Sequence, residues 1–312
     1  MTWLLSGGAG YIGAHVAEAV GAAGHDVVVL DDLSTGRAER IPGVPLVVAG
    51  LLDGPDALAD VLRTHQVHGI VHLAAKKSVA ESVRHPLYYY ETNVTGTVAL
   101  LQAATRTGVR AVLYSSTAAV YGETTADAVT ETHPTLPTNP YGESKLAGEW
   151  AVRRAAEAHG LAWTALRYFN VAGAARPELA ETEGDNLLPR ALRAARTGEP
   201  IAVYGSDWPT PDGTCVRDYI DVVDLAEAHA AAVDALEGGA TGGVLNVGRG
   251  RGLSVLDVLD AVEEVTGKEV PRRYAPRRPG DPARVVADAG RITEVLGWSA
   301  RRDVTAMVAG GR

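Results

Sequence analysis

Apolar and polar positions follow two different patterns in the first half of the chain. Short runs of mostly apolar residues predict buried strands, over residues 3–5, 26–30, 46–49, 69–73, 111–115 and 162–166. Between these runs the apolar residues recur at helical spacing, over residues 14–23, 55–65, 87–107 and 141–159. Apolar strands that alternate with helices predict a parallel sheet with helices on both faces. We therefore expect an α/β fold built on a doubly wound parallel sheet.

The pattern changes after residue 170, where glycines, prolines and charged residues become frequent. Helical patterns cover residues 186–197, 221–237 and 254–266, and a strand pattern covers residues 244–247. Residues 204–215 and 271–282 are typical of loops. We therefore expect two domains, a first over residues 1–170 and a smaller α/β domain over residues 171–312, with the chain able to cross back between them.

A glycine-rich stretch joins the first strand to the first helix. Residues 6–13 are Ser-Gly-Gly-Ala-Gly-Tyr-Ile-Gly, with the glycines spaced as G-x-G-x-x-G or G-x-x-G-x-x-G. Such glycines let the backbone turn tightly and let a pyrophosphate approach the N–H groups of the helix start. Asp31, at the end of the second strand, suits the hydroxyls of an adenine ribose, and its charge favours NAD over NADP. A close-packed turn without a ligand is the alternative that the loop alone leaves open.

Residues 139–145, Asn-Pro-Tyr-Gly-Glu-Ser-Lys, predict a reactive tyrosine at the start of a helix. Asn139 suits the N-cap and Pro140 the first helical position, so Tyr141 and Lys145 stand one turn apart on the same face. A free tyrosine has a pKa of about 10, and a neighbouring ammonium group lowers it by stabilising the phenolate. The pair can then take a proton from a sugar hydroxyl while a hydride leaves the same carbon. A hydroxyl among residues 115–117, at the end of the preceding strand, can bond the reacting oxygen.

The composition restricts the possible partners. The formal net charge of -9 argues against a general binder of nucleic acid or anionic membranes. No apolar run reaches membrane-spanning length, and the first residues lead directly into a strand, so we expect no signal peptide. Cys215 is the only cysteine, which excludes a disulfide within the chain and fits the cytoplasm. The histidines show no metal-ligand spacing, so we expect no metal site.

These features resemble the extended short-chain dehydrogenase/reductases, a Rossmann-type family, and within it the UDP-glucose/UDP-galactose 4-epimerases. The resemblance covers about residues 3–305. Segments typical of the wider family are residues 7–13, 81–83, 93–97, 120–122, 140–145 and 167–170, and segments more specific to the epimerases are residues 212–214, 216–220 and 275–281. The resemblance implies reversible epimerisation at C4 of a UDP-hexose. A hydride passes transiently to tightly bound NAD, and a 4-keto sugar rotates before the hydride returns to its other face.

The resemblance also implies the roles of individual residues. The catalytic residues are Tyr141, Lys145 and Thr117. The residues that contact NAD are Gly7, Gly10, Tyr11, Ile12, Gly13, Asp31, Asp32, Leu51, Leu52, Leu73, Ala74, Ala75, Lys77, Asn93, Ser115, Tyr141, Lys145 and Tyr168. The residues that contact the UDP-sugar are Lys77, Thr117, Tyr141, Phe169, Asn170, Asn186, Leu187, Ala202, Tyr204, Arg217, Tyr219, Arg278, Asp281 and Val285. The first domain then binds NAD and the second the UDP-sugar, and the family is usually a homodimer that pairs two long helices in a four-helix bundle.

Several positions depart from the family pattern and leave the substrate open. Leu51 replaces a frequent aspartate near the adenine, so recognition of the adenine has to be apolar or use backbone groups. Val285 stands where some members carry a tyrosine, and the smaller side chain leaves room for an N-acetyl sugar. Ala118 and Ala119 replace the acid and base that sugar-nucleotide dehydratases need, which disfavours dehydration. The alternatives are a UDP-N-acetylhexosamine or uronate 4-epimerase, a decarboxylase, and a scaffold protein that senses NAD without catalysis.

Overall fold

The computed structural model describes residues 1–181, 186–278 and 281–311. Contacts within the chain divide it into two compact units. The first unit comprises Met1–Gly122, Pro134–Arg167 and Ala226–Leu245, and the second comprises Glu123–His133, Tyr168–Leu225 and Asn246–Arg312. Each unit therefore combines segments that are distant in sequence, and the assignment of NAD and substrate to separate domains stays a prediction.

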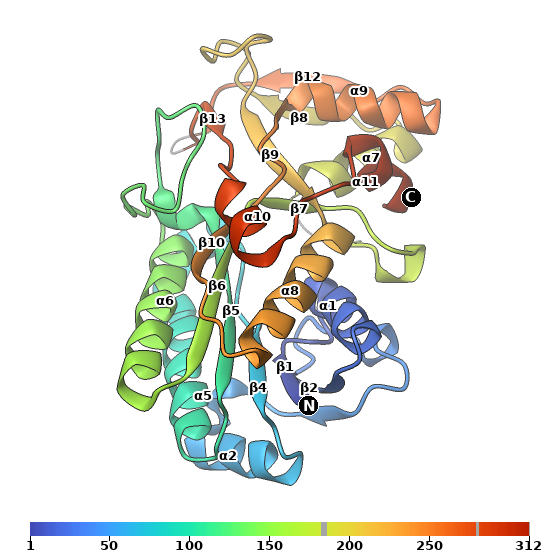
Figure 1. Cartoon of the computed structure of the whole chain (residues 1–312). Helices are drawn as coiled ribbons and strands as arrows, with labels where there is room; N and C mark the ends of the chain where they lie inside the picture. Colours follow the sequence, from blue (N-terminus) through green and yellow to red (C-terminus); the bar gives the residue numbers. More distant parts are fainter. Residues whose placement is uncertain (182–185, 279–280, 312) are drawn as a thin grey trace. The chain divides into compact units, whose positions relative to one another are not determined.

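A seven-stranded sheet forms the centre of the first unit (Figure 1). Its strand order is β10-β6-β5-β4-β1-β2-β3, and β1 pairs in parallel with both β2 and β4. The strands are β1 (Thr2–Ser6), β2 (Asp26–Asp31), β3 (Leu46–Val48), β4 (Gly69–His72), β5 (Ala111–Thr117), β6 (Ala162–Tyr168) and β10 (Gly243–Val247). The predicted doubly wound parallel sheet is confirmed, and its winding reverses at β1. Ligands of such sheets bind at the carboxyl ends of the strands beside this reversal.

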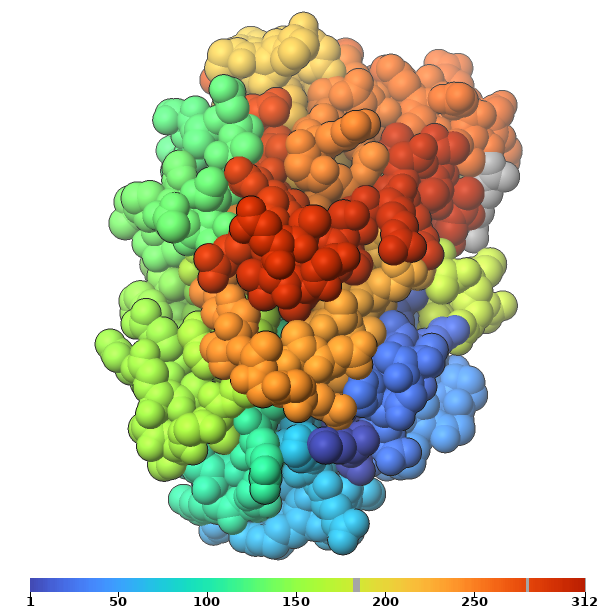
Figure 2. Space-filling view, viewed as in Figure 1, coloured from blue at the N-terminus to red at the C-terminus, as the bar shows by residue number. Residues whose placement is uncertain are grey.

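Helices cover both faces of this sheet. In Figure 1, α2 (Pro55–Thr64), α5 (Gly96–Thr105) and α6 (Pro140–His159) lie on one face, while α1 (Tyr11–Ala22) and α8 (Val222–Glu237) lie on the other. Trp3 donates its indole N–H to Glu237 at 2.9 Å, and His25 Nε2 lies 2.7 Å from Asp234 Oδ1. The end of α8 therefore packs beside the amino end of the sheet, and Figure 2 shows these orange and blue segments next to each other.

The long helix expected over residues 87–107 is present as one unbroken helical stretch over residues 86–105, but it is not α-helical throughout. The segment contains α4 (Pro86–Tyr89), a π-helical turn η3 (Tyr90–Thr95) and then α5, and it follows α3 (Val79–Arg84), which the sequence pattern did not predict. The turn carries Asn93, which is 1% exposed and accepts the Lys76 N–H at 2.8 Å while donating to Ser144 Oγ at 3.0 Å. A π turn adds a residue to one helical turn, often at functional sites, and apolar spacing does not record it.

Short strands and helices form the second unit (Figure 1). β9 (Val216–Asp221) pairs with β7 (Asn170–Ala172), β11 (Gly252–Ser254) and β13 (Arg284–Val285), and β8 (Ile201–Tyr204) pairs in parallel with β12 (Arg272–Ala275). Helices α7 (Leu187–Thr197), α9 (Val255–Thr266) and α11 (Val304–Gly310) pack around Ala191, Leu259 and Val308, and α10 (Gly290–Leu296) follows β13. Of the short 3-10 helices, η5 (Pro177–Leu179) belongs to this unit, whereas η1 (Ala38–Arg40), η2 (Leu51–Asp53) and η4 (Ala118–Tyr121) belong to the first unit.

Two local features of the second unit show how far sequence signals reach. The helix predicted over residues 254–266 is present as α9, where Ser254 caps it by accepting the Asp257 N–H at 2.9 Å and Gly267 ends it in the left-handed region. Residues 271–282 were expected to form a loop, yet they contain β12. This strand carries two arginines and a tyrosine among its four residues, so no apolar pattern marks it.

Candidate functional site

The glycine loop has the geometry that its sequence predicted. Gly7 has a φ of +74°, in the left-handed region that favours glycine, and a Cβ on Gly13 would lie 2.2 Å from the Gly7 carbonyl oxygen. Helix α1 follows with Gly10 as its N-cap. A glycine offers no side-chain acceptor to the N–H groups of the first turn, so these groups are available to an anion. The loop therefore fits the pyrophosphate of a dinucleotide.

Asp31 closes β2 beside this loop. Its carboxylate accepts the Ala9 N–H at 2.9 Å through Oδ2 and the Leu33 N–H at 2.9 Å through Oδ1. Burial raises the pKa of Asp31, and the two backbone N–H groups oppose that effect. Each oxygen retains acceptor capacity, which suits the two hydroxyls of a ribose. Loop and carboxylate together fit the adenosine half of a dinucleotide.

The predicted tyrosine and lysine lie at the start of α6. Asn139 caps the helix by accepting the Gly142 N–H at 2.9 Å, and Pro140 occupies its first turn. Burial raises the pKa of Tyr141, and a hydrogen bond with the Thr117 hydroxyl lowers it. Burial also lowers the pKa of Lys145 to about 7. The expected lowering of the Tyr141 pKa is therefore not the net effect in the protein alone, because loss of water around the phenol outweighs the hydrogen bond.

Hydrogen bonds that the sequence did not predict connect the end of β1 to the π turn. The Ser6 hydroxyl lies 2.7 Å from His72 Nδ1, and His72 Nε2 lies 2.8 Å from the Thr97 hydroxyl. Thr97 donates to the Asn93 carbonyl at 2.6 Å, so its oxygen accepts the hydrogen bond that His72 donates through Nε2–H. Burial, together with Lys145, lowers the pKa of His72 to about 3 and keeps the ring neutral. The only sequence signal for His72 is a histidine inside an apolar strand pattern.

The other predicted cofactor residues of the first unit differ in their surroundings. Leu51 is 7% exposed and packs against Gly96, whereas Leu52 is 48% exposed. Lys77 Nζ lies 5.8 Å from the centre of the Tyr11 ring. The remaining ones lie in the loop, in the first turn of α1, directly after β2 and β4, and in β5: Gly10, Ile12, Asp32, Leu73, Ala74, Ala75 and Ser115. Ser115 is fully buried, and its hydroxyl lies 3.2 Å from His229 Nε2 on α8.

In the second unit, predicted UDP residues gather around one carboxylate. Asp281 accepts from Arg278 Nε at 2.9 Å, and Arg217 Nη2 lies 3.9 Å from its other oxygen. The Arg278 guanidinium stacks 4.6 Å from the centre of the Tyr204 ring. Burial raises the pKa of Tyr219 to about 12. Two guanidinium groups beside an aromatic ring are suited to a diphosphate and a base.

The remaining predicted substrate residues of the second unit are not all part of this cluster. Val285 pairs in register with Arg217 on β9, and Ala202 lies on β8. The Asn186 amide donates to Glu181 at 2.6 Å, just before Leu187 opens α7. Tyr168 ends β6, Asn170 begins β7, and Phe169 lies between the two strands. Residues 279 and 280 of the predicted segment 275–281 lie outside the described residues.

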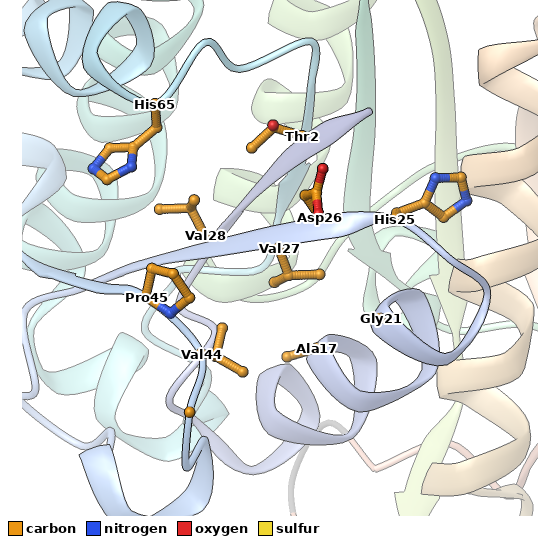
Figure 3. Close-up of a pocket in the computed structure, with 11 residues that line it drawn as sticks. Thr2, Ala17, Gly21, His25, Asp26, Val27, Val28, Val44, Pro45 and His65 are labelled. Atoms are coloured by element: carbon orange, nitrogen blue, oxygen red, sulfur yellow. The ribbon is translucent and has the colours of Figure 1, made fainter.

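A surface hollow of about 410 Å³ lies in the first unit, away from the predicted site (Figure 3). Figure 3 shows Thr2 on β1, Val28 on β2, Ala17 on α1 and Pro45 around it, with His25 and His65 at its sides. It lies toward the amino end of β2, whereas Asp31 closes the carboxyl end. Among the described residues, no group of three or more His, Cys, Asp or Glu side chains is arranged to hold a metal. In the same part of the chain, no helix is both long and apolar enough to span a membrane.

Comparison with known proteins identifies close relatives over nearly the whole chain. The sequence model of the NAD dependent epimerase/dehydratase family matches residues 3–248. A UDP-glucose 4-epimerase from Azospirillum brasilense is 46% identical over 304 residues, which are 96% of this chain and 87% of that protein. One from Streptomyces lividans is 46% identical over 309 residues, with 98% and 93% covered. The crystal structure of the Stenotrophomonas maltophila UDP-glucose-4-epimerase, with bound NAD and formylated UDP-arabinopyranose, matches with a TM-score of 0.95 and 39% identity, covering 100% of this chain and 96% of that one.

Proposed function

The chain belongs to the NAD dependent epimerase/dehydratase family, and we propose that it interconverts UDP-galactose and UDP-glucose by inverting the sugar carbon C4. The observation that carries this proposal is that Tyr141 and Lys145 begin α6 in the same unit as the glycine loop and Asp31. The arginine cluster of the second unit supports a nucleoside diphosphate as the carrier of the sugar.

The residues of this chain then divide the work as follows. Tyr141 takes the proton from the 4-hydroxyl and gives it back when the sugar is reduced on its other face. Thr117 bonds the same oxygen, and Lys145 stabilises the phenolate of Tyr141. Bound NAD supplies the acceptor and donor of the C4 hydride. Arg217 and Arg278 bind the diphosphate, which holds the nucleotide while the sugar rotates.

Because the hydride returns in every cycle, the reaction consumes no NAD. Purified protein incubated with UDP-galactose and no added NAD should therefore form UDP-glucose. Chromatographic separation of the two nucleotide sugars measures the conversion. Protein with Tyr141→Phe is the matched control and should form UDP-glucose at least roughly 100-fold more slowly. Turnover of a UDP-uronate without interconversion of the two hexoses would contradict the proposal and favour a related enzyme of the family.

Val285 favours a second substrate, an N-acetyl sugar. A valine at this position leaves more room beside the sugar than the tyrosine that some family members carry. We infer that UDP-N-acetylgalactosamine is also epimerised. The Val285→Tyr variant should lose turnover of the N-acetyl substrate while it retains turnover of UDP-galactose. Equal loss of both substrates, or wild-type protein inactive on the N-acetyl sugar, would argue against this second substrate.

We also infer a homodimer that buries apolar side chains of the first unit. Val83 on α3, Leu87 on α4, Val98 on α5 and Trp150 on α6 are between 38% and 79% exposed. A helical face of this kind is suited to a four-helix bundle with a second copy. The Leu87→Glu, Trp150→Glu double variant should be monomeric in light scattering, whereas Tyr274→Glu on β12, also more than half exposed, should remain a dimer. A cytoplasmic location stays a prediction that rests on the single cysteine.

A further inference from the structure

A third charged residue continues the row of Tyr141 and Lys145 on α6. Glu149 follows Lys145 by four residues, so all three side chains lie on one face, one turn apart. Lys145 is 3% exposed and Glu149 is 4% exposed. Buried charges on a helix are costly unless partners compensate them, so the partners of Glu149 decide what it does.

Three donors hold the Glu149 carboxylate. Arg167 on β6 donates through Nε to Oε1 at 2.8 Å and through Nη2 to Oε2 at 2.6 Å, which is a bidentate ion pair. The Ser116 hydroxyl on β5 donates to Oε1 as well. The Arg167 guanidinium stacks 4.9 Å from the centre of the Tyr121 ring. Glu149 is therefore held in one orientation by groups from two strands, β5 and β6.

The groups that face Lys145 come from two strands, β4 and β5, and from α6 itself. Its ammonium group lies 4.7 Å from the centre of the Tyr114 ring on β5. His72 on β4 is buried and neutral, and Tyr141 precedes by one turn. Glu149 is the anion that raises the pKa of Lys145 against the effect of burial. Two other acids lie around α6. Glu81 accepts a hydrogen bond from the Tyr89 hydroxyl, and Glu143 accepts one from the Tyr90 hydroxyl.

Glu149 influences Lys145 through its charge and not through a direct ion pair. Among the described residues, no ion pair within 4.0 Å joins the two side chains, because the carboxylate already accepts from Arg167 and Ser116. We propose that Glu149, held by Arg167 and Ser116, is a positioning residue that favours the ammonium form of Lys145 and leaves it outside any ion pair, so that it can act on Tyr141. This inference rests on the roles of Tyr141 and Lys145 in the proposed function.

The test measures the ionisation of Lys145 itself. Lysines in this chain are Lys76, Lys77, Lys145 and Lys268, so labelling with ε-13C-lysine gives few resonances, and Lys145→Arg identifies the one of interest. In Glu149→Gln, which keeps the side-chain shape and removes the charge, the midpoint pH of the Lys145 titration should fall by roughly one pH unit. In Arg167→Gln, which leaves the carboxylate without its counter-ion, the midpoint should rise.

The opposite directions separate an electrostatic role from a structural one. Val152→Ala removes packing from the same helix at a residue that is 1% exposed, and it should leave the midpoint unchanged. If Arg167→Gln does not fold, Ser116→Ala replaces it, with a smaller rise expected. A midpoint that ignores Glu149→Gln, or that moves in the same direction in both charge variants, would overturn the inference. The titration needs no substrate, so a protein that shows these shifts but does not epimerise UDP-hexoses would contradict the proposed function alone.

Discussion

The candidate residues of the two units are held in opposite ways. In the first unit, Lys145 is 3% exposed and Asp31 is 6% exposed, and both lie in or at the end of regular elements. In the second unit, the side chain of Arg278 is 54% exposed, and stacking on Tyr204 together with one carboxylate holds it. Burial dominates around Lys145 and Asp31, whereas stacking and a charged contact at the surface hold Arg278.

The two arrangements suit two kinds of work. A proton transfer depends on a shifted pKa, and large shifts need side chains that are removed from water. Binding of a diphosphate needs cations that a ligand can reach from solvent, and a buried guanidinium without a partner is too costly to keep in readiness. Substitutions in the first group should therefore act mainly on kcat, and those in the second mainly on binding.

The largest effect is expected for Tyr141→Phe, because it removes the group proposed to carry the proton. We expect kcat to fall by roughly 100-fold to 10,000-fold, the usual contribution of general acid–base catalysis, while the NAD that copurifies with the protein is unchanged. Nucleotide released by denaturation measures that content. Tyr90→Phe is the matched control, since this phenol bonds Glu143 instead. Activity within tenfold of the wild-type value would exclude Tyr141 as the base.

The next effect concerns the arginines of the second unit. Arg278→Leu should weaken UDP binding by roughly 30-fold, since loss of one charge-assisted partner costs about 2 kcal/mol or more, and kcat should stay within about threefold. Calorimetric titration with UDP and steady-state kinetics measure the two quantities. Arg273→Leu, an exposed residue of β12, should leave both unchanged. A loss confined to kcat would contradict the view that residues of the second unit act mainly on binding.

Acid should act on the first unit through His72. Its pKa is lowered from 6.5 to about 3 in the folded protein. Between these pH values the histidine is protonated in the unfolded chain and neutral in the folded one. The stability that this histidine contributes is complete above pH 6.5 and falls toward pH 3, by up to about 1.4 kcal/mol per pH unit. Urea unfolding at several pH values measures the slope. His72→Gln, which keeps a donor for Thr97, should reduce the slope, and an unchanged slope would exclude His72 as its source.

The smallest effect concerns the adenine. Leu51 offers no acceptor to the amino group of the base, so NAD and its deaminated analogue, nicotinamide hypoxanthine dinucleotide, should bind within about threefold of each other. Competition between the two dinucleotides for protein stripped of cofactor measures the ratio. A preference of tenfold or more for NAD would mean that another acceptor, such as a backbone carbonyl, reads the amino group.

Local signals in the sequence predicted much of the site. Three of these signals are each encoded within a few residues: the glycine spacing, the aspartate at the end of β2 and the Asn-Pro cap before Tyr141. The structure has the turn, the strand end and the helix cap that they predict. The strands of the first unit were predicted for the same reason, since uninterrupted apolar runs need burial on both faces. In the second unit, strands such as β12 carry the charged residues themselves, so the same pattern could not identify them.

The sequence by itself thus determined the order of the strands along the chain, the start of α6 and the residue types available for chemistry. Only the tertiary structure decided their environment. The π turn that places Asn93 inward, the contact of Ser115 with a histidine 114 residues away and the bidentate pair of Arg167 with Glu149 join segments that no local pattern connects. The physical reason is that desolvation depends on everything packed around a group. The lowered pKa of Lys145, at about 7, is a property of that packing and not of its four-residue spacing from Tyr141.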